Sequence, residues 1–360
     1  MKIVFCGGGT GGHITPMLAM ADILRQNEKN AEFFFIGRRG GKENDAIRRA
    51  GFTPYEIEIS GLRRSASPSN VMAAFKALSA RREARRILSD VSPDAVIGTG
   101  GYVSWPVLSA AKSLGIKRAI HESNAVPGLV TRICCRSVDT VMLGYAEARS
   151  HLPKCNAIVT GNPVRGAVGR ISRTRARAAL GIPKSKTVVL SFGGSLGAEV
   201  LNSVISEVIQ LDGGKSGITF IHATGRREYE KYSSCSEKQA IILPYIEDMP
   251  IYLAAADIAV CRCGALTIAE LGAAEVASIL IPSPNVTANH QYENARALAQ
   301  CGAAVMITEE LLYPEGLYRE ILRLSKSVEQ REKMRAVLRE KYGRCDKKIA
   351  QALHSLLNEK

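Results

Sequence analysis

The stretch IVFCGGGTGGH at residues 3–13 joins a short apolar run to a glycine-rich loop, and it indicates the fold. A buried parallel strand that runs into glycines and then into a helix is typical of the first unit of a doubly wound α/β domain. Gly7, Gly9 and Gly12 match the G-x-G-x-x-G pattern of dinucleotide-binding folds. After the second apolar run, Gly37-Arg38-Arg39 replaces the acidic residue that would bind an NAD ribose. The loop therefore predicts an anion-binding turn, argues against NAD and merely permits NADP.

Short apolar runs alternate with segments of helical period along the whole chain, which predicts βαβ units and parallel sheets. A chain of 360 residues also exceeds what one hydrophobic core usually organises. The pattern is interrupted at Gly161-Asn162-Pro163 and restarts near residue 187. We therefore predict two doubly wound α/β domains, 1–163 and 164–342, and a final helix at 343–360 that is able to pack on the first. The expected strands are 3–5, 33–36, 95–97, 118–120, 140–142, 157–159, 187–192, 218–221, 240–243, 258–260 and 278–281.

Composition and charge exclude several classes of protein. Hydrophobic residues make up 46% and charged residues 23% of the chain, as in compact globular proteins. Nine cysteines without a C-x-x-C pair indicate reduced thiols rather than disulfides or a zinc site. No signal peptide and no membrane-spanning apolar run are recognised, so we expect a soluble, cytosolic chain. The net charge of +14 favours anionic partners, but nucleic acid is not expected, because helix-turn-helix, zinc-finger and aromatic RNA-binding motifs are lacking.

Two further loops have the composition of anion-binding turns. FGGSLGA at 192–198 again lies between an apolar run and a helical segment, and CRCGALTIAE at 261–270 follows the run that ends at Val260. Glycines let backbone amides approach an anion, and a helix N-terminus adds N–H donors and partial positive charge. On this interpretation the second of these loops holds a diphosphate, and Glu270 accepts hydrogen bonds from both ribose hydroxyls of a nucleotide. The alternatives are tight strand-to-helix turns and a capping box formed by Thr267 and Glu270.

Seven sequence blocks follow one another in an order that resembles one enzyme family. They are GGTGGH at 8–13, GTGGYV at 98–103, HESNAVPG at 121–128, TGNPVR at 160–165, GGSLGA at 193–198, GALTIAE at 264–270 and NHQ at 289–291. Over nearly its whole length the chain resembles the MurG-type family, the UDP-N-acetylglucosamine:undecaprenyl-diphospho-muramoylpentapeptide transferases. The resemblance implies the GT-B architecture, in which two Rossmann-like doubly wound parallel-sheet domains face a cleft. The first domain would bind the lipid acceptor and the second UDP-GlcNAc.

The resemblance also implies a reaction. Enzymes of this family move GlcNAc, with inversion, from UDP-GlcNAc to the C4 hydroxyl of MurNAc in undecaprenyl-diphospho-MurNAc-pentapeptide, the step from lipid I to lipid II in peptidoglycan biosynthesis. The expected partners are therefore UDP-GlcNAc and the undecaprenyl-linked muramyl-pentapeptide. The sequence contains no Asp-x-Asp pair to hold a divalent cation, so we expect no metal and no other cofactor. The alternatives are another GT-B enzyme, a glycolipid glycosyltransferase or a UDP-GlcNAc 2-epimerase, and the first-domain blocks argue against both.

Carried over by position, the resemblance assigns residues to the sugar nucleotide. Gln291 would contact the sugar and Ile246 the uracil, whereas the alternatives for these two are a polar helix start and core packing. Ser195 and Arg165 would lie at the diphosphate end, and the alternative for Arg165 is a solvated linker charge. With the ribose contact of Glu270, the phosphate contacts of the loop and a sugar contact from the first domain, the donor-binding set is Thr10, Gly11, Gly12, Asn124, Arg165, Ser195, Ile246, Ala265, Leu266, Thr267, Ile268, Ala269, Glu270 and Gln291.

Transfer to a hydroxyl needs a base that takes its proton during attack. His13, at the start of the first helix, is the candidate, because the partial positive charge of a helix N-terminus keeps an imidazole neutral. Glu122 and Tyr102, from other first-domain blocks, are rival bases, and Tyr102 is also placed on the acceptor side. The alternative for His13 is a structural role in capping or packing its loop. From the sequence, the choice among the three stays open.

Residues 70–88 predict an amphipathic helix in which basic residues flank an apolar stripe. With a lipid acceptor, such a helix suits an anionic membrane surface, where each Lys or Arg contributes roughly 1 kcal/mol. The alternative is a helix packed on the first sheet with a solvated basic side. We expect a peripheral protein on the cytoplasmic face of the bacterial inner membrane, with a cell-wall synthesis complex as a further partner. The residues expected at the membrane are Phe75, Arg81, Arg82, Arg85 and Arg86.

Two positions depart from the family pattern. Ala274-Glu275-Val276-Ala277 stands where Ala-Gly-Leu-Pro is usual, so we expect a different turn into the following strand. Cys263 stands where serine is usual, which removes one hydroxyl near the nucleotide. Neither change removes a residue that we assign to chemistry.

Overall fold

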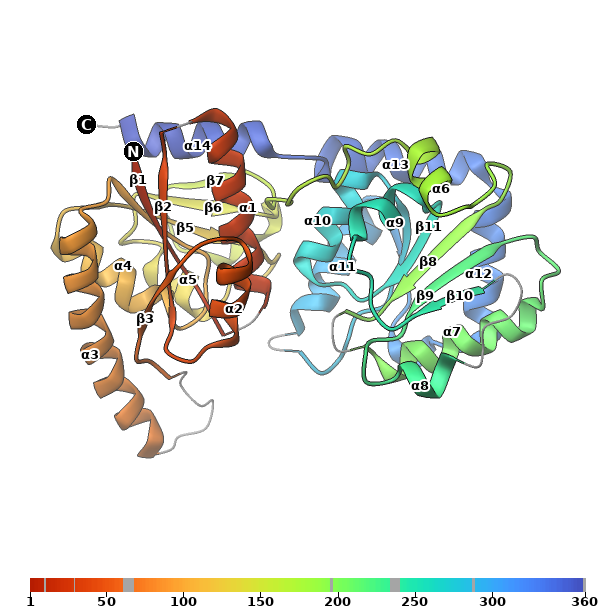
Figure 1. Cartoon of the computed structure of the whole chain (residues 1–360), viewed down its shortest axis with the longest axis horizontal. Helices are drawn as coiled ribbons and strands as arrows, with labels where there is room; N and C mark the ends of the chain where they lie inside the picture. The colour runs from red at the N-terminus through yellow and green to blue at the C-terminus, as the bar shows by residue number, and fades with distance from the viewer. Residues whose placement is uncertain are drawn as a thin grey trace. The chain divides into compact units, whose positions relative to one another are not determined.

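The computed structural model describes residues 1–9, 11–28, 30–60, 68–194, 197–233, 240–286 and 289–358; for residues 11, 42 and 68–74 it describes the backbone alone. The chain forms two compact units (Figure 1). Unit 1 comprises Met1–Arg165 and Cys345–Lys360, and unit 2 comprises Gly166–Arg344. The final helix, α14 (Asp346–Asn358), therefore belongs to unit 1, although it follows the whole of unit 2 in the sequence.

Unit 1 is built on a sheet of seven parallel strands. The strands are β1 (Lys2–Cys6), β2 (Glu32–Arg38), β3 (Pro54–Ile57), β4 (Ala95–Gly98), β5 (Lys117–Glu122), β6 (Thr140–Leu143) and β7 (Ala157–Val159). Their order across the sheet is β3-β2-β1-β4-β5-β6-β7. Six of them coincide with expected apolar runs. The sequence prediction misses β3, because this edge strand is partly exposed and contains proline and glutamate rather than a continuous apolar run.

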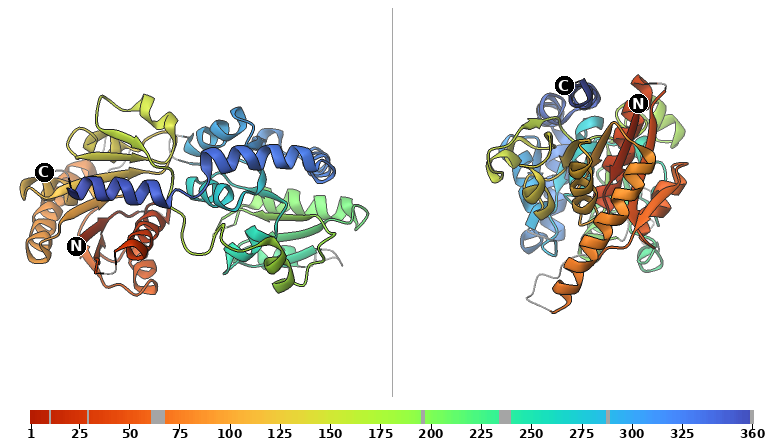
Figure 2. Two further views of the ribbon diagram at one scale, coloured as in Figure 1. Left: turned by 90° about the horizontal axis from the view of Figure 1, so that it is seen from above. Right: turned by 90° about the vertical axis from the view of Figure 1, so that its left-hand side faces the viewer.

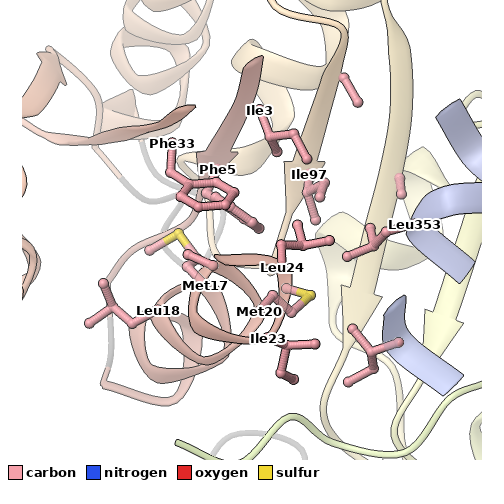
Figure 3. Close-up of a cluster of buried hydrophobic side chains, with 14 of the residues drawn as sticks. Ile3, Phe5, Met17, Leu18, Met20, Ile23, Leu24, Phe33, Ile97 and Leu353 are labelled. Carbon is pink, nitrogen blue, oxygen red and sulfur yellow. The ribbon is translucent and has the colours of Figure 1, made fainter. Parts of the chain in front are cut away.

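Helices cover both faces of this sheet. They are α1 (Gly11–Asn27), α2 (Lys42–Arg49), α3 (Pro68–Val91), α4 (Ser104–Ser113), α5 (Leu129–Cys134) and the 3-10 helix η1 (Ala146–His151), together with α14. Successive strand residues point to opposite faces, so β1 divides the core into two layers. Ile3 and Phe5 pack with α1 and α14 on one face (Figure 3). Val4 and Cys6 pack with α3 and α4 on the other.

Unit 2 is built on a sheet of six parallel strands. The strands are β8 (Val188–Phe192), β9 (Thr219–Ala223), β10 (Ala240–Leu243), β11 (Ile258–Cys261), β12 (Ala277–Leu280) and β13 (Ala304–Met306). Their order is β10-β9-β8-β11-β12-β13. The sequence prediction misses β13, a short, partly exposed edge strand.

The helices of unit 2 enclose a second core. They are α6 (Arg173–Ala179), α7 (Glu199–Asp212), α8 (Tyr229–Tyr232), α9 (Met249–Ala255), α10 (Ala265–Ala274), α11 (His290–Gln300), the 3-10 helix η4 (Glu309–Leu311), α12 (Pro314–Lys326) and α13 (Val328–Tyr342). Leu201 and Ile205 of α7 and Ile321 of α12 pack with Val189 and Val260 of the sheet. Each unit therefore has a hydrophobic core of its own.

Both units reverse their strand order at the centre of the sheet. In unit 1 the reversal lies between β1 and β4, and in unit 2 between β8 and β11. Ligands of open parallel sheets bind outside the carboxyl ends of the strands at such a switch point. The predicted fold class, two doubly wound parallel-sheet domains, is confirmed, and all three glycine-containing loops follow strands that flank a switch point.

The turn after α10 contains a non-glycine residue in the left-handed conformation. Glu275 caps the helix in the left-handed conformation, with φ 53° and ψ 48°. A non-glycine residue pays about 1 kcal/mol or more for this backbone geometry. Arg339 of α13 holds the Glu275 carboxylate through two hydrogen bonds, from Nε at 3.0 Å and from Nη2 at 2.6 Å. A side-chain pair thus replaces the conformational freedom of glycine.

Candidate functional site

In unit 1 the loop after β1 packs closely against the loop after β4, and hydrogen bonds connect the two. Thr99 donates from its backbone N–H to Cys6 O at 2.9 Å and from Oγ1 to His13 O at 2.6 Å. A Cβ atom on Gly7 would lie 2.3 Å from Thr99 Oγ1, and one on Gly101 would lie 2.0 Å from Gly8 O. The glycines therefore serve close packing between the two loops.

His13 is the third residue of α1, and the same loops hold its imidazole. Nδ1 lies 3.0 Å from Gly8 O. Because a carbonyl only accepts hydrogen bonds, Nδ1 carries the hydrogen, and the basic lone pair of the neutral ring is on Nε2. Gly100, with φ 97°, passes so close that a Cβ there would lie 2.9 Å from His13 Cδ2. Backbone contacts thus set both the tautomer and the position of the ring.

Tyr102 and Glu43 border the first glycine loop. A Cβ on Gly9 would lie 2.9 Å from Cε1 of Tyr102, so the ring lies directly beside the loop. Burial raises the pKa of the Tyr102 phenol, and the nearby Glu43 raises it further while Arg38 lowers it. Glu43 of α2 is 4% exposed, and its Oε1 accepts from Arg38 N at 3.3 Å. Sequence reasoning missed Glu43, because its segment has only the pattern of a short charged helix.

Glu122 closes the loop that follows β5. Its Oε1 accepts from the backbone N–H of Asn124 at 3.0 Å and from Asn124 Nδ2 at 3.2 Å. Its Oε2 accepts from Gly128 N at 2.9 Å and from Thr131 Oγ1 at 2.7 Å. All four bonds lie within residues 122–131, and the carboxylate is 5% exposed. This carboxylate therefore orders the loop that carries Asn124.

Neighbouring buried residues tie this loop to the block at 160–165. His121 Nε2 lies 3.2 Å from Gly161 O, which makes this nitrogen the donor, and burial lowers the pKa of the His121 imidazole. Asn162 Nδ2 donates to Ser123 O at 3.0 Å. Sequence reasoning assigned no role to His121 or Asn162, although both lie inside blocks that it singled out. Arg165 is exposed and is the last residue of the first segment of unit 1. Burial raises the pKa of the Asp22 carboxyl on α1, and the nearby positive charge of Arg165 lowers it.

In unit 2 the loop after β8 also contains glycines at positions where a side chain would be too close to neighbouring atoms. A Cβ on Gly193 would lie 2.6 Å from the Cβ of Ala198, and one on Gly197 would lie 2.3 Å from Thr224 O. Helix α7 begins directly after this loop. Ser195, like Thr10 of unit 1, lies outside the described residues, so the predictions for these two side chains stay predictions.

The loop after β11 leads into α10, whose first residue is Ala265 with Gly264 as the N-cap. The capping box of Thr267 and Glu270 is therefore wrong, because Thr267 lies inside the first turn. Ile268 N donates to Gly264 O at 3.0 Å, whereas the α-helix offers no partner to the first three amides, of residues 265–267. The side chains of Ile268 and Ala269 are buried, while Leu266, Thr267 and Glu270 are partly exposed.

Gln291, the second residue of α11, joins two loops of unit 2. Its Oε1 accepts from Cys263 N at 3.2 Å and from Ser283 N at 3.0 Å, which connects the ends of β11 and β12. The amide NH₂ is then the part of this side chain suited to donate to a ligand. Cys263 itself is fully buried. The side chain of Ile246 is also buried, at 4% exposed, which agrees with core packing.

Arg262 is a further residue of this region that sequence reasoning missed. Its guanidinium donates to Ile281 O at 3.3 Å and forms a short ion pair with Glu309. Arg262 thus connects the β11 loop to the residue after β12 and to η4. The only signal in the sequence was one arginine between two cysteines, which does not indicate a partner.

Helix α3 combines a packed part and an exposed part. Ala80, Ala84 and Leu88 are fully buried in the core under the sheet. Phe75 is 65% exposed and Leu78 48% exposed, and the N-terminal end of the helix extends beyond the strands of unit 1 (Figures 1 and 2).

The basic side of α3 faces mainly outward. Arg82, Arg85 and Arg86 are exposed, and Arg81 is half-buried. Lys76 forms an ion pair with Glu58 at 3.0 Å. The packed interpretation thus describes the C-terminal half of α3, whereas the described side chains of Phe75 and Leu78 are largely exposed. Among the described residues, we find no helix with the length and apolar character that a membrane span requires.

Comparisons with known proteins identify the family. The glycosyltransferase family 28 N-terminal domain matches residues 3–143, and the family 28 C-terminal domain matches residues 188–350. A UDP-N-acetylglucosamine--N-acetylmuramyl-(pentapeptide) pyrophosphoryl-undecaprenol N-acetylglucosamine transferase of Acetivibrio thermocellus is 44% identical over 91% of this chain and 90% of its own length. The enzyme of the same name from Bacillus licheniformis is 40% identical over 89% of each chain.

Solved structures agree with these sequence matches. The crystal structure of MurG from Acinetobacter baumannii has a TM-score of 0.78 and 28% identity, and the match covers 98% of this chain and 99% of that one. A UDP-GlcNAc 2-epimerase from Neisseria meningitidis, bound to UDP-GlcNAc, has a TM-score of 0.67 at 14% identity over all of both chains, which shows the fold alone. This chain therefore belongs to glycosyltransferase family 28 and, within it, to the GT-B family of UDP-N-acetylglucosamine--N-acetylmuramyl-(pentapeptide) pyrophosphoryl-undecaprenol N-acetylglucosamine transferases.

Proposed function

We propose that this enzyme transfers GlcNAc from UDP-GlcNAc to the C4 hydroxyl of MurNAc in undecaprenyl-diphospho-MurNAc-pentapeptide, with inversion. Relatives that are 40–44% identical over about nine-tenths of the chain are named for this donor and acceptor. The observation that carries the chemical step is the orientation of His13, whose Nδ1 faces Gly8 O and whose Nε2 therefore carries the basic lone pair. A neutral imidazole with a fixed tautomer is suited to general base catalysis near neutral pH.

In the proposed step, Nε2 of His13 takes the proton of the acceptor C4 hydroxyl. The hydroxyl oxygen forms a bond to C1 of GlcNAc as the bond from C1 to the diphosphate oxygen breaks, so the anomeric centre inverts and UDP leaves with the electron pair. The imidazolium then returns its proton to solvent. One base and one displacement thus account for the transferred proton, the bond that forms at C1 and the bond to UDP that breaks.

The geometry favours His13 over its two rivals. The Glu122 carboxylate already accepts four hydrogen bonds from its own loop, so using it as a base would cost part of that loop's order. The Tyr102 phenol has a raised pKa, which disfavours the phenolate that a base needs. We propose that Glu122 positions Asn124 and that Tyr102 contacts the acceptor.

The donor is proposed to bind at the start of α10. The amides of residues 265–267 can donate to the diphosphate, where the helix dipole also favours negative charge. Glu270 would accept from the ribose diol, and the NH₂ of Gln291 would donate to the sugar. Because the Ile246 side chain is buried, its main chain would contact the uracil. The assignments of Thr10, Gly11, Gly12, Asn124, Arg165 and Ser195 to the donor rest on the family resemblance.

We propose that transfer needs neither a metal nor another cofactor. The amides at the α10 N-terminus, together with arginine, would stabilise the charge on the departing UDP, as preorganised dipoles do in other sites. The test is transfer of labelled GlcNAc from UDP-GlcNAc to a short-chain lipid-linked muramyl-pentapeptide in the presence of EDTA. We expect product formation with EDTA and no turnover with donor alone. Turnover of UDP-GlcNAc without an acceptor would instead identify an epimerase, and loss of transfer with EDTA would contradict metal independence.

We also propose that α3 docks the enzyme on the cytoplasmic face of the bacterial inner membrane, with a cell-wall synthesis complex as a further partner. Phe75 and Leu78 are exposed beside a basic helix side. Changing Arg81, Arg82, Arg85 and Arg86 to Glu is expected to abolish sedimentation with anionic phospholipid vesicles. The matched control reverses four cations of unit 2, Arg226, Lys231, Arg296 and Arg323, and should retain sedimentation. Equal loss in both variants, or no loss in either, would contradict docking through α3.

A further inference from the structure

A cavity of about 280 Å³ lies in unit 2, away from the loops described above. Its wall comes from the segment Gly169–Arg173, from α9, from the end of α10 at Ala273–Glu275, and from α13, all of which can be located in Figure 1. It borders the C-terminal end of α10, whereas the proposed donor amides lie at the N-terminal end, roughly 15 Å along the helix at 1.5 Å per residue. The cavity is therefore distinct from the proposed donor site.

Cations outnumber anions around this cavity. Three arginines line it, Arg173, Arg335 and Arg339, against two carboxylates, Glu275 and Glu332. The three arginines are arranged from the interior to the solvent: the side chain of Arg335 is 9% exposed, that of Arg173 40%, and that of Arg339 63%. The cavity thus has a buried cation and an accessible one on its wall.

The buried carboxylate behind the cavity does not balance this charge. Asp257, which is 5% exposed, accepts from Arg173 at 2.9 Å and from Arg177 at 2.5 Å, and it lies 3.6 Å from Arg335 Nη2. With Arg331 nearby, five arginines (Arg173, Arg177, Arg331, Arg335, Arg339) face three carboxylates (Asp257, Glu275, Glu332). Burial lowers the pKa of Arg173, and the positive charge of Arg335 lowers it further. The cluster is therefore short of negative charge.

Arg335 also has unused hydrogen-bonding capacity. Its Nε and Nη2 atoms are buried and have no hydrogen-bond partner among the described residues. Buried N–H groups of a charged side chain that remain unsatisfied are costly, and native structures usually give them a partner. Nη1 of Arg335 pairs with Glu332, and an oxyanion in the cavity would add negative charge beside this guanidinium.

We propose that this cavity is a binding site for a small multivalent oxyanion of the phosphate and diphosphate class. Arg335 holds the anion from the buried side of the wall, and Arg339 holds it from the exposed side in competition with Glu275. The volume lies below the usual range of about 300–1,000 Å³ for drug-sized ligands, so the cavity suits a small anion rather than a nucleotide.

The proposed oxyanion site lies near both segments through which the chain passes between the two units. Gly169 and Ile171 belong to the segment that enters unit 2 after Arg165, and α13 precedes the return of the chain to unit 1 at Cys345. Arg344 Nη1 donates to Val168 O at 2.5 Å, which joins the two connections. A bound anion would thus contact residues near both.

The test is isothermal titration calorimetry of the full chain with inorganic diphosphate, with saturating UDP present to occupy the donor site. We expect saturable binding of one diphosphate, and Arg339→Gln should weaken it about tenfold, which corresponds to about 1.4 kcal/mol. The matched control is Arg323→Gln, because Arg323 forms a comparable two-bond pair with Glu320 but does not line the cavity. Its affinity for diphosphate should be that of the wild type.

Arg339 is chosen because it is largely exposed, so that its loss leaves the core intact. Arg335→Gln is a second variant, and if it folds it should weaken binding by tenfold or more. Absence of saturable binding when UDP is present would overturn the proposal, because any remaining diphosphate binding would then belong to the donor site. Equal weakening in the Arg339 and Arg323 variants would overturn it as well, since the effect would then be general electrostatics.

Discussion

The two units have the same strand order except for the additional β7 of unit 1, but the loops at the ends of their central strands carry different chemical groups. At the switch point of unit 1, the loops after β1 and β4 present two titratable side chains: His13, whose Nδ1 faces Gly8 O, and Tyr102, whose ring lies beside Gly9. At the switch point of unit 2, the loop after β11 presents the amides of α10, and Gln291 connects this loop to the next.

The contrast suits a transfer reaction whose two tasks are divided between two copies of one scaffold. A titratable group of fixed tautomer serves proton transfer, whereas amides at a helix N-terminus serve the binding of an anion. If the division is correct, loss of His13 in unit 1 lowers the rate of the chemical step, and loss of Glu270 in unit 2 lowers the affinity for the donor.

The largest effect is expected from His13→Ala. Loss of a general base typically lowers kcat by about 10²–10⁴-fold, and here the KM for UDP-GlcNAc should stay near its wild-type value. Steady-state kinetics of GlcNAc transfer measures both. His151→Ala, which changes an exposed histidine of the same unit, is the control and should keep full activity. A raised KM with unchanged kcat in the His13 variant would place this residue with donor binding and break the comparison.

The second effect concerns the stability of the unit 1 loops. Gly101 has φ 74°, and an added Cβ would lie 2.0 Å from Gly8 O, so Gly101→Ala should destabilise the protein by about 3 kcal/mol. Gly51→Ala is the control, because Gly51 has φ 86° and no atom within 4 Å of an added Cβ. It pays the backbone cost alone, about 1 kcal/mol. Urea unfolding of both variants measures the difference, and equal losses would show that loop packing adds nothing.

The third effect lies in unit 2. A hydrogen bond to a charged group contributes about 1.5–3 kcal/mol, so Glu270→Gln should raise the KM for UDP-GlcNAc roughly tenfold to a hundredfold. The value of kcat should change much less. Glu320→Gln, on α12, is a matched control whose carboxylate pairs with Arg323. A drop in kcat at unchanged KM would assign Glu270 to the chemical step instead.

The smallest effect is a pH dependence that distinguishes the buried histidines. Burial lowers the pKa of His222 to about 4, below the ordinary value of 6.5, so the folded state resists protonation. Stability is therefore retained above pH 6.5 and lost as the pH falls from 6.5 towards 4. Between pH 7 and pH 5.5 this amounts to about 1 kcal/mol.

Urea unfolding at the two pH values, in the wild type and in His222→Gln, measures the contribution of His222. The variant should lose about 1 kcal/mol less than the wild type between pH 7 and pH 5.5. His121→Gln is the comparison in unit 1, where burial also lowers the pKa but Gly161 O accepts from the ring. An identical pH dependence in the wild type and the His222 variant would show that His222 does not titrate in this range.

The sequence predicted eleven of the thirteen strands that the structure describes, together with the glycine loops, but missed β3 and β13, one edge strand of each sheet. The central strands are buried on both faces and read as continuous apolar runs, whereas β3 and β13 are short edge strands with exposed positions. The capping box at Thr267 was wrong for a related reason. Where α10 begins depends on where β11 ends and on Gly264, and residue spacing within the loop does not contain that information.

By itself, the sequence determined the fold class, the positions of the glycine loops and the family, because these depend on local patterns that recur along the chain. The partners of the polar residues follow from the tertiary structure alone. Glu122 is a candidate base in the sequence, but in the fold it receives four hydrogen bonds from residues 124–131. Likewise, the arginines around Asp257 come from α6 and α13, which are far apart in the chain. Hydrogen bonding and charge balance depend on distances in space, and the packing of the helices on the sheet sets those distances.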